Sequence, residues 1–376
     1  MAFTMFWEIL WALILGFTIS ACVQAVVSTR EMVRVLGDDR PKTLAVACGL
    51  GAASSSCSYA AVAIARSLVR KGANFTAAMT FQLASTNLVV ELTVIMVLLL
   101  GWQFAAAEFV GAPIMVVILA LLFRRFLTPR MIDASRAQAE KGIAGRMEGH
   151  ADMHMEVVDG RPLVRRLFSP EGRTAVSHYF VMDWASVWVD IALGLLIAGA
   201  LAVVVPTGFW NAFFLSGHPT IAKLWGPIVG PLVAIVSFVC SVGDVPLAAV
   251  LWNSGISFGG VIAFIFADLI ILPILDIYRR YYGRPMSWFL LWTFYVAMAG
   301  AALAVELVFG ALGLVPTTRS ARVLEATIAW NYTTWLNIAF LLLAAVMVMR
   351  FLRTGGPMML RMMDAAPAGA PPTTGA

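Results

Sequence analysis

Residues 48–91 read CGLGAASSSCSYAAVAIARSLVRKGANFTAAMTFQLASTNLVVE. Two apolar runs in this stretch are interrupted by the polar cluster SSSCS at 54–58 and by a shorter break, STN at 85–87, one turn before Glu91. An unpaired polar group in hydrocarbon costs several kcal/mol, so such clusters persist in apolar sequence only where they line a cavity within the protein. The stretch is therefore predicted to carry function.

The composition of the whole chain indicates a membrane protein. Of its 376 residues, 61% are hydrophobic and 12% are charged, and the mean hydropathy is +0.86. A soluble globular protein carries about 25% charged residues. Several apolar runs reach the roughly 20 residues that a helix needs to cross a bilayer. The sequence thus predicts an all-α polytopic membrane protein whose surroundings are the lipid bilayer.

The net charge of +5 does not indicate nucleic-acid binding. The basic residues cluster in short loops beside apolar runs, which is the pattern that sets membrane topology. One substantial polar region lies at 128–180, and the end of the chain is rich in Ala, Pro, Gly and Thr. The candidate membrane segments are 6–28, 43–70, 75–100, 104–127, 181–205, 225–253, 258–279, 286–314 and 327–350.

The sequence contains an internal repeat. Cys57-Ser58 aligns without a gap on Cys240-Ser241, 183 residues later, and both copies continue with apolar sequence. The matches that carry most weight are those of uncommon residue types, because alanine matches arise by chance in such a chain. In the same register, Gly72 matches Gly255, Phe75 matches Phe258 and Phe81 matches Phe264. This pattern favours a duplication.

The distribution of positive charge favours hairpins over spans for the two repeated segments. If all nine segments span, the 26 Lys and Arg residues divide almost evenly between the two sides. If 43–70 and 225–253 are re-entrant hairpins, all but Lys223, Arg319 and Arg322 fall on one side. Such a bias marks the cytoplasmic side. The alternative is two long, kinked helices that span the bilayer, giving nine spans.

The hairpin interpretation predicts two inverted-topology repeats, with about seven full spans plus two re-entrant segments and the N-terminus outside. Inverted repeats with broken helices at mid-membrane are typical of secondary transporters. The predicted organisation is repeat 1 over 1–128, a cytoplasmic linker over 129–180, repeat 2 over 181–315, an additional transmembrane helix over 316–352 and a disordered cytoplasmic tail over 353–376.

Both repeats carry motifs of a known family. The second copy reads VCSVGDVPLAA at 239–249, then GIS at 255–257 and AFIFA at 263–267; the first has CS at 57–58 and FQLAS at 81–85. Over roughly 40–315 the chain resembles the ArsP-type predicted permeases, a bacterial inner-membrane family that includes efflux permeases for trivalent organoarsenicals such as methylarsenite. The resemblance implies a multi-pass protein of the bacterial cytoplasmic membrane that exports a small solute. The family's motif is C-S-C, and here the second thiol is replaced by Tyr59 and Val242.

Two cysteines are the first substrate-binding candidates. Cys57 and Cys240 occupy equivalent positions at the two predicted hairpin tips. If the tips meet, two thiols face one solute, and thiolates are ligands for soft, thiophilic elements. The alternative is that both are small buried packing residues.

Polar residues near the tips are the second set of candidates. The N-terminus of a half-helix presents free N–H groups and the positive end of the helix dipole, which suits an anion or a lone-pair donor. The alternative is that these side chains satisfy the backbone at a break and let helices pack closely. The set comprises Ser55, Ser56, Ser58, Ser241 and Asn87.

Three acidic residues at predicted membrane depth are candidates for proton coupling: Asp244, Asp268 and Glu91. Ionisable groups at this depth are costly and face the bundle interior, a water cavity or a proton route. The alternative is structural hydrogen bonding between helices.

No nucleotide-binding motif and no recognisable catalytic nucleophile occur in the sequence, so neither enzymatic activity nor a cofactor or metal site is predicted. Three functions remain open. The first is a secondary permease that exports a small solute, with trivalent organoarsenicals as the candidate. The second is an anion or polar-metabolite permease without thiol ligation, and the third is a non-transporting membrane partner subunit.

Overall fold

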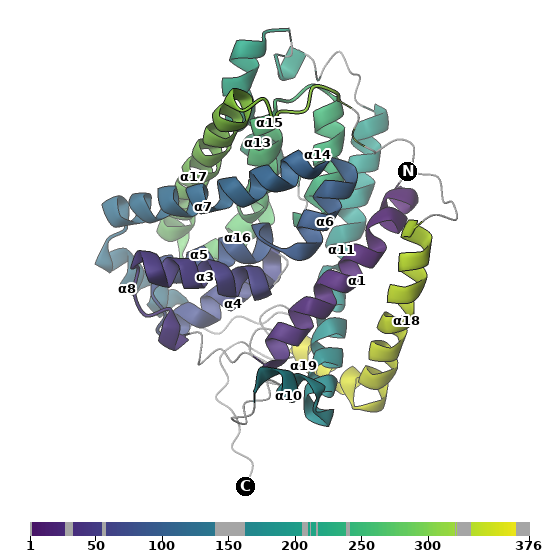
Figure 1. Ribbon diagram of the computed structural model, residues 1–376. Coiled ribbons are helices and arrows are strands. Elements are labelled where there is room, and N and C mark those ends of the chain that lie inside the picture. Colours follow the sequence, from purple (N-terminus) through teal and green to yellow (C-terminus); the bar gives the residue numbers. More distant parts are fainter. Residues whose placement is uncertain are drawn as a thin grey trace.

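The computed structural model of the chain describes residues 2–26, 33–54, 58–139, 162–204, 210, 212–215, 217–237, 241–319, 321 and 332–365. All regular structure within these ranges is helical, as predicted (Figure 1). Six described stretches are long and apolar enough to cross a membrane, which confirms the multi-pass character. They are Phe75–Leu99, Trp102–Phe126, Thr220–Ser237, Phe258–Tyr282, Arg284–Ala311 and Thr333–Arg353.

The helices follow one another with short connections. The first half contains α1 (Ala2–Val26), α3 (Pro41–Ser54), α4 (Ser58–Arg70), α5 (Phe75–Asn87), α6 (Val90–Leu99), α7 (Trp102–Phe126) and α8 (Pro129–Ala139). The second half contains α10 (Leu163–Phe168), α11 (Pro170–Val204), α13 (Pro219–Ser237), α14 (Ser241–Asn253), α15 (Phe258–Phe266), the 3-10 helix η1 (Ala267–Leu269), α16 (Leu272–Tyr282), α17 (Arg284–Ala311), α18 (Tyr332–Arg353) and α19 (Gly356–Ala365).

In both repeated segments the described helices lie on either side of a polar cluster. Helix α3 is described to Ser54 and α4 from Ser58; helix α13 is described to Ser237 and α14 from Ser241. The residues between them, 55–57 and 238–240, lie outside the described residues, so the predicted breaks stay a prediction. Whether either segment turns back to the side from which it enters stays a prediction, since α13 is by itself long enough to span.

The regions expected to lack structure contain helices. The predicted linker over 129–180 includes α8 and α10, and α11 begins at Pro170, eleven residues before the predicted span at 181. The tail, predicted to be disordered from residue 353, forms α19 over Gly356–Ala365. The Met, Leu and Arg residues of this helix are good helix formers, and the Ala-, Pro-, Gly- and Thr-rich residues that led to the prediction lie mostly beyond 365, outside the described residues.

Helix boundaries recur at the offset of the sequence repeat. Helices α4 and α14 end 183 residues apart, and α5 and α15 begin 183 residues apart. The turns before α5 and α15 match as well: Gly72 has φ +100° and Gly255 has φ +110°, a region that disfavours a side chain. At the same offset, Asn74 caps α5 and Ser257 caps α15.

Two arginines extend this correspondence beyond the part of the repeat that the sequence reveals. Arg136 donates from Nη2 to the carbonyl oxygen of Ala73 at 3.1 Å. Arg319, again 183 residues later, donates from Nη1 to the carbonyl oxygen of Ile256 at 2.9 Å. Ala73 and Ile256 are themselves equivalent, so each half uses one arginine to hold the turn between a broken helix and the helix that follows.

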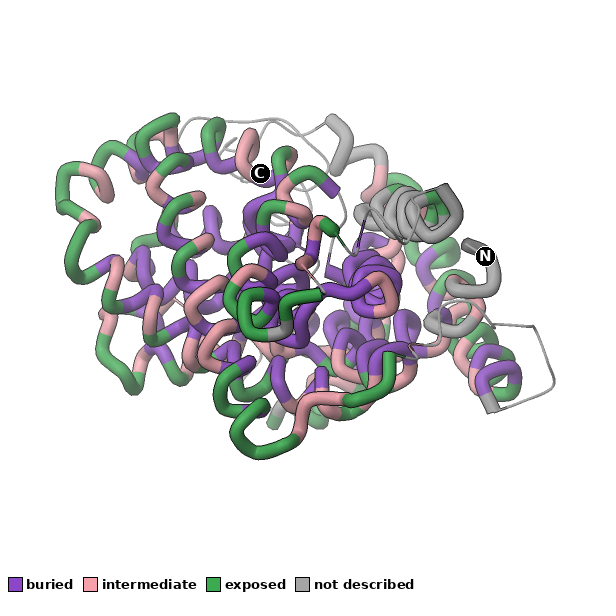
Figure 2. Tube along the Cα trace, turned by 90° about the horizontal axis from the view of Figure 1, so that it is seen from above, coloured by how far each residue is buried: buried purple, intermediate pink, exposed green. Residues whose placement is uncertain are grey.

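Close helix packing positions the breaks. Helix α3 packs on α5 and α13 packs on α15. A Cβ added to Gly51 would lie 2.4 Å from the carbonyl oxygen of Phe81, and one added to Gly230 would lie 2.5 Å from that of Gly260. Only glycine permits such an approach of two helix backbones. Figure 2 shows the buried residues gathered in the interior.

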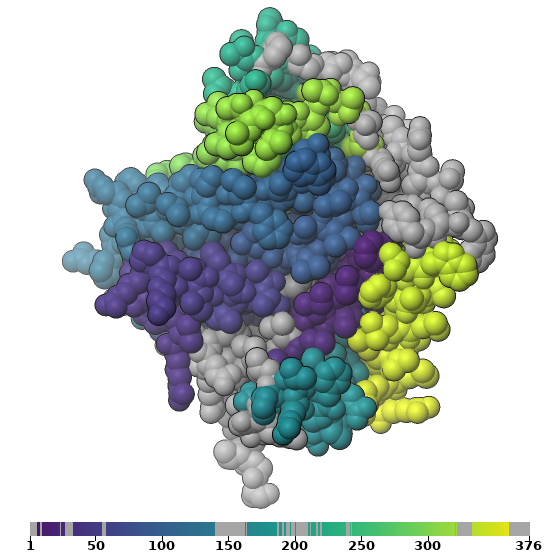
Figure 3. Space-filling model, in the orientation of Figure 1, coloured from purple at the N-terminus to yellow at the C-terminus, as the bar shows by residue number. Residues whose placement is uncertain are grey.

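Three helices form a separate group at one side of the molecule. Helices α1, α11 and α18 pack on one another (Figure 1), and α18 lies on the surface beside α1 (Figure 3). The outward side chains of α18 are large and apolar, among them Trp335, Leu342 and Val346, which are exposed. Such a face suits contact with lipid.

Candidate functional site

The two broken helices meet at their serines. Ser58 is the first residue of α4 and Ser241 the first of α14, and their Oγ atoms lie 2.9 Å apart. Both side chains are buried. The contact therefore joins two predicted site residues that occupy equivalent positions 183 residues apart.

Asp268 completes this cluster. Its Oδ2 accepts hydrogen bonds from Ser58 Oγ at 2.8 Å and from Ser241 Oγ at 2.6 Å, and the residue is fully buried. Asp268 lies on η1, where α15 ends and before α16 begins, and not within a continuous helix. Hydrogen bonds to a carboxylate are stronger than those between neutral groups. We refer to Ser58, Ser241 and Asp268 as the serine–aspartate cluster.

Asp244 lies close to this cluster without bonding to it. It is on the first turn of α14 and is 0% exposed, and neither carboxylate oxygen has a hydrogen-bond partner within the described ranges. Its carboxyl is near enough to that of Asp268 for electrostatic repulsion between them. An unpartnered carboxyl at this depth is costly as an anion and points to a functional role.

Asn87 is buried at the end of α5 but is satisfied locally. Its Nδ2 donates to the carbonyl oxygen of Leu83 at 3.0 Å and to Thr86 Oγ1 at 3.1 Å. These bonds belong to its own helix end. The structure therefore places Asn87 outside the set of contacts that joins the two serines to Asp268.

Glu91 points toward α1. It is buried on the first turn of α6, and a Cβ added to Gly16 of α1 would lie 2.5 Å from the Cβ of Glu91. The close contact between this side chain and Gly16 holds α1 against α6. Glu91 thus lies at a helix–helix contact, and a part in proton coupling stays a prediction.

Four of the predicted residues lie outside the described residues: Ser55, Ser56, Cys57 and Cys240. A polar chain reaches the edge of this region from the α1–α11 side. Ser20 Oγ donates to the carbonyl oxygen of Ser54 at 2.6 Å, and Gln24 Nε2 donates to Ser20 Oγ at 2.9 Å and to Asp183 Oδ2 at 3.1 Å. The chain anchors the end of α3 next to the break.

Three further buried polar residues were not predicted as site residues. Gln82 donates from Nε2 to the hydroxyl of Tyr278, and its Oε1 has no partner among the residues described. Glu108 is an acid in the apolar sequence of α7. Asp244 was predicted as a site residue because ionisable groups at membrane depth are costly, and the same argument applies to Glu108. Glu306 accepts a hydrogen bond from the amide of Gly259 and is buried.

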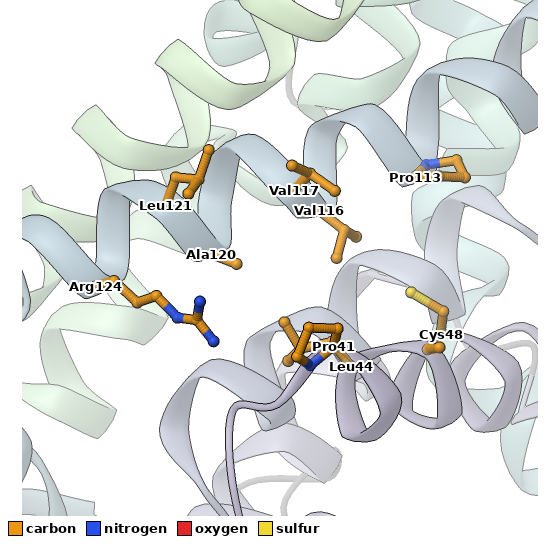
Figure 4. A pocket seen from close by; sticks show the side chains of 10 residues that line it. Pro41, Leu44, Cys48, Pro113, Val116, Val117, Ala120, Leu121 and Arg124 are labelled. Atoms are coloured by element: carbon orange, nitrogen blue, oxygen red, sulfur yellow. The ribbon is translucent and has the colours of Figure 1, made fainter.

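A groove lies away from the serine–aspartate cluster, between α3 and α7 (Figure 4). Its volume is about 270 Å³, and Cys48 and Arg124 are among the residues that line it. Arg124 donates from Nε to Asp39 at 3.1 Å at one end of the groove. The wall is otherwise apolar and holds none of the predicted site residues. Cys22 and Cys48 are both free thiols.

Comparison with known proteins identifies the family. The family described as "Predicted permease", of the ArsP type, matches residues 1–307. A Mycobacterium tuberculosis protein named "Putative permease Rv2963" is 64% identical to this chain over 342 residues, which cover 91% of this chain and 84% of that protein. No solved structure matches. With most of its length matched by the family and a relative this similar, the chain belongs to the ArsP-type family of membrane permeases.

Proposed function

We propose that the protein is a secondary permease that exports a small solute by alternating access around the starts of α4 and α14. The observation that carries the proposal is the pair of hydrogen bonds by which Ser58 and Ser241 share one oxygen of Asp268. The two serines come from the two broken helices, so a change in how those helices meet changes the cluster. A solute that binds these hydroxyl groups in place of Asp268 would therefore be bound differently before and after the helices move.

The proposed substrate class is trivalent organoarsenicals. Methylarsenite is neutral in water and carries two hydroxyl groups, which can donate to Asp268 and accept from the serines. Thiol ligation by Cys57 and Cys240, which flank the serines in sequence, would add soft ligands. In this proposal the serine–aspartate cluster orients the solute and the thiols hold the arsenic.

The two repeats are proposed to have inverted topology, with the N-terminus outside and the linker inside a bacterial cytoplasmic membrane. Recurrence of helix ends, glycine turns and arginine contacts at one offset supports duplication. Single cysteines placed in the turns 71–74 and 254–257 would test the orientation. The first should react with an impermeant reagent only from the inside and the second only from the outside.

Growth of an arsenic-sensitive bacterium tests the substrate. Expression of the protein should protect against methylarsenite, and Cys57→Ala with Cys240→Ala should remove protection. Absence of any protection by the unaltered chain, at confirmed expression, would exclude this substrate. The surface variant Asp276→Asn is the matched control, since this carboxyl pairs with Arg279 and Arg280 at the protein surface.

A polar-metabolite permease is the second candidate function. It is favoured by the composition of the described cluster, whose polar atoms are all hydroxyl and carboxyl oxygens. Transport that survives both cysteine substitutions but is lost in Ser58→Ala or Ser241→Ala would establish this alternative. If the protein is a non-transporting subunit, liposomes that contain the purified protein would show no solute flux.

A further inference from the structure

Glu108 is a buried acid to which the proposed transport cycle assigns no role. It lies near the start of α7 and is 1% exposed, and neither Oε1 nor Oε2 has a hydrogen-bond partner among the described residues. No basic side chain described in the structure pairs with it. A carboxyl left in this state must take up a proton or be stabilised by another ligand.

The packing of α7 brings Glu108 near Asp268. Gly111, one helical turn after Glu108, allows α7 to approach the end of α15, because a Cβ at this position would lie 2.8 Å from the Cζ of Phe266. Phe266 is two residues before Asp268. The carboxyl groups of Glu108 and Asp268 are close enough to repel each other as anions.

The two oxygens of Asp268 differ in their surroundings. Oδ2 accepts both serine hydroxyls, whereas Oδ1 makes no hydrogen bond of normal geometry with the residues described, although Thr86 and the amide of Leu269 lie near the carboxylate. Two buried acids within electrostatic reach titrate as a pair, because ionisation of one disfavours ionisation of the other. The two serine hydroxyls stabilise the anionic form of Asp268, and Glu108 has no such donors among the described residues.

Two other titratable groups lie within electrostatic reach of Asp268, Asp244 on α14 and Tyr278 on α16. Two further buried acids are Glu306 on α17 and Glu91 on α6. Glu306 is held by the amide of Gly259, and Tyr278 by Gln82. Of the carboxyls here, Asp244 and Glu108 are the two for which both oxygens lack a partner in the described part of the chain.

We propose that Glu108 and Asp268 form a proton-exchange pair in which the position of one proton depends on whether the serine hydroxyls are free or bound to solute. This inference rests on the proposed permease function and adds its coupling residue. With both hydroxyls donating to it, Asp268 is the carboxylate and Glu108 holds the proton. When a solute takes the hydroxyls, Asp268 takes up a proton from water on one side of the membrane and Glu108 releases its proton to water on the other side, so the negative charge moves to Glu108 and one proton crosses the membrane.

Transport measurements on purified protein in liposomes distinguish proton coupling from solute binding. The probe is methylarsenite, and the variants are Glu108→Gln and Glu108→Asp, with Asp276→Asn as control. Exchange of labelled methylarsenite without a pH gradient should survive in Glu108→Gln, while acceleration by an imposed pH gradient should be lost. Glu108→Asp should restore part of that acceleration. Gradient-driven transport that is unchanged in Glu108→Gln would overturn the proposal.

Infrared spectroscopy of the purified protein tests the proton itself and needs no substrate. The unaltered chain should show the carbonyl-stretch band of a protonated carboxyl, and this band should be lost or weakened in Glu108→Gln but kept in Asp276→Asn. A band that is the same in all three proteins would overturn the assignment of the proton to Glu108. If the unaltered chain moves no methylarsenite, the proposed substrate fails, and the infrared result still decides the role of Glu108.

Discussion

The two halves of the molecule agree in their scaffold and differ in their acids. Positions that match at the offset of 183 residues set helix ends, turns and caps, as in Gly72 with Gly255 and Arg136 with Arg319. Among the described residues of the site, Ser58 and Ser241 form a matched pair. Matched positions therefore build the frame and bring the two broken helices together.

The buried acids have no counterpart. The residues at equivalent positions are Ala61 for Asp244, Ser85 for Asp268, Leu291 for Glu108 and Ile274 for Glu91. Each of these buried acids thus occurs in one half only, without an acid at the equivalent position of the other half. Because a buried carboxyl is costly, its presence in one half only indicates that it serves the site and not the frame.

The largest effect is expected when Asp268 is replaced by serine, the residue at the equivalent position of the first half. Asp268→Ser removes the shared acceptor of two charge-assisted hydrogen bonds and should lower methylarsenite transport in liposomes by at least about tenfold. The control is Ser85→Ala, which loses only a bond to the carbonyl oxygen of Gln82 within its own helix. Equal transport activity of the two variants would contradict the view that matched positions build the scaffold while the unmatched acids take part in transport.

The arginine pair should differ in strength. Arg319 donates to both Trp252 and Ile256 and lies over the Trp252 ring at 4.5 Å, so Arg319→Ala should cost about 2 kcal/mol of stability after allowance for its partial exposure. Arg136→Ala should cost about 1 kcal/mol, because Arg136 makes the Ala73 bond while its buried Nε has no partner in the described part.

Thermal unfolding of the purified variants in detergent measures this difference. Arg319→Lys and Arg136→Lys keep the charge but lose the planar donor geometry, and should fall between the unaltered protein and the alanine variants. A larger loss for Arg136→Ala than for Arg319→Ala would show that the second turn does not depend on its arginine contacts.

The two turn glycines should be equally sensitive. Gly72→Ala and Gly255→Ala each place a side chain at positive φ and should each cost about 1 kcal/mol. At Gly72 the added Cβ meets nothing within 4 Å, so the cost is that of the backbone alone. Gly49→Ala, inside α3 and equally free of contacts, should stabilise the protein slightly. Denaturant unfolding would show whether the two turn variants coincide.

Sequence reasoning finds features that depend on local polarity and fails for those that depend on packing. Ser58, Ser241 and Asp268 stand out because polar groups are rare in apolar sequence, and the structure brings the three side chains together. Asn87 stands out for the same reason, but a bond to Leu83 within its own helix satisfies it. Glu108 was missed because it lies only four residues after the start of the predicted segment 104–127, where an acid can reach interfacial water, and only the structure shows that it is buried.

The smallest effects are expected at the helix caps. The side chain of Asn74 accepts from the amides of Thr76 and Ala77, so Asn74→Ala should cost about 1 kcal/mol. Ser257 accepts from Gly260, and Glu306 accepts separately from Gly259 at the same helix end. With that second acceptor in place, Ser257→Ala should cost less than Asn74→Ala.

Combining the cap substitutions isolates what Glu306 adds to the second half. Ser257→Ala and Glu306→Leu together should cost more than the sum of the two single variants, because leucine accepts no hydrogen bond and only the double variant leaves this end of α15 without either of its original caps. Additive losses in thermal unfolding would mean that the two acceptors act independently. Unchanged stability in the Glu306 single variant would instead mean that this buried acid, which has no counterpart at Phe123, serves the site and not the cap.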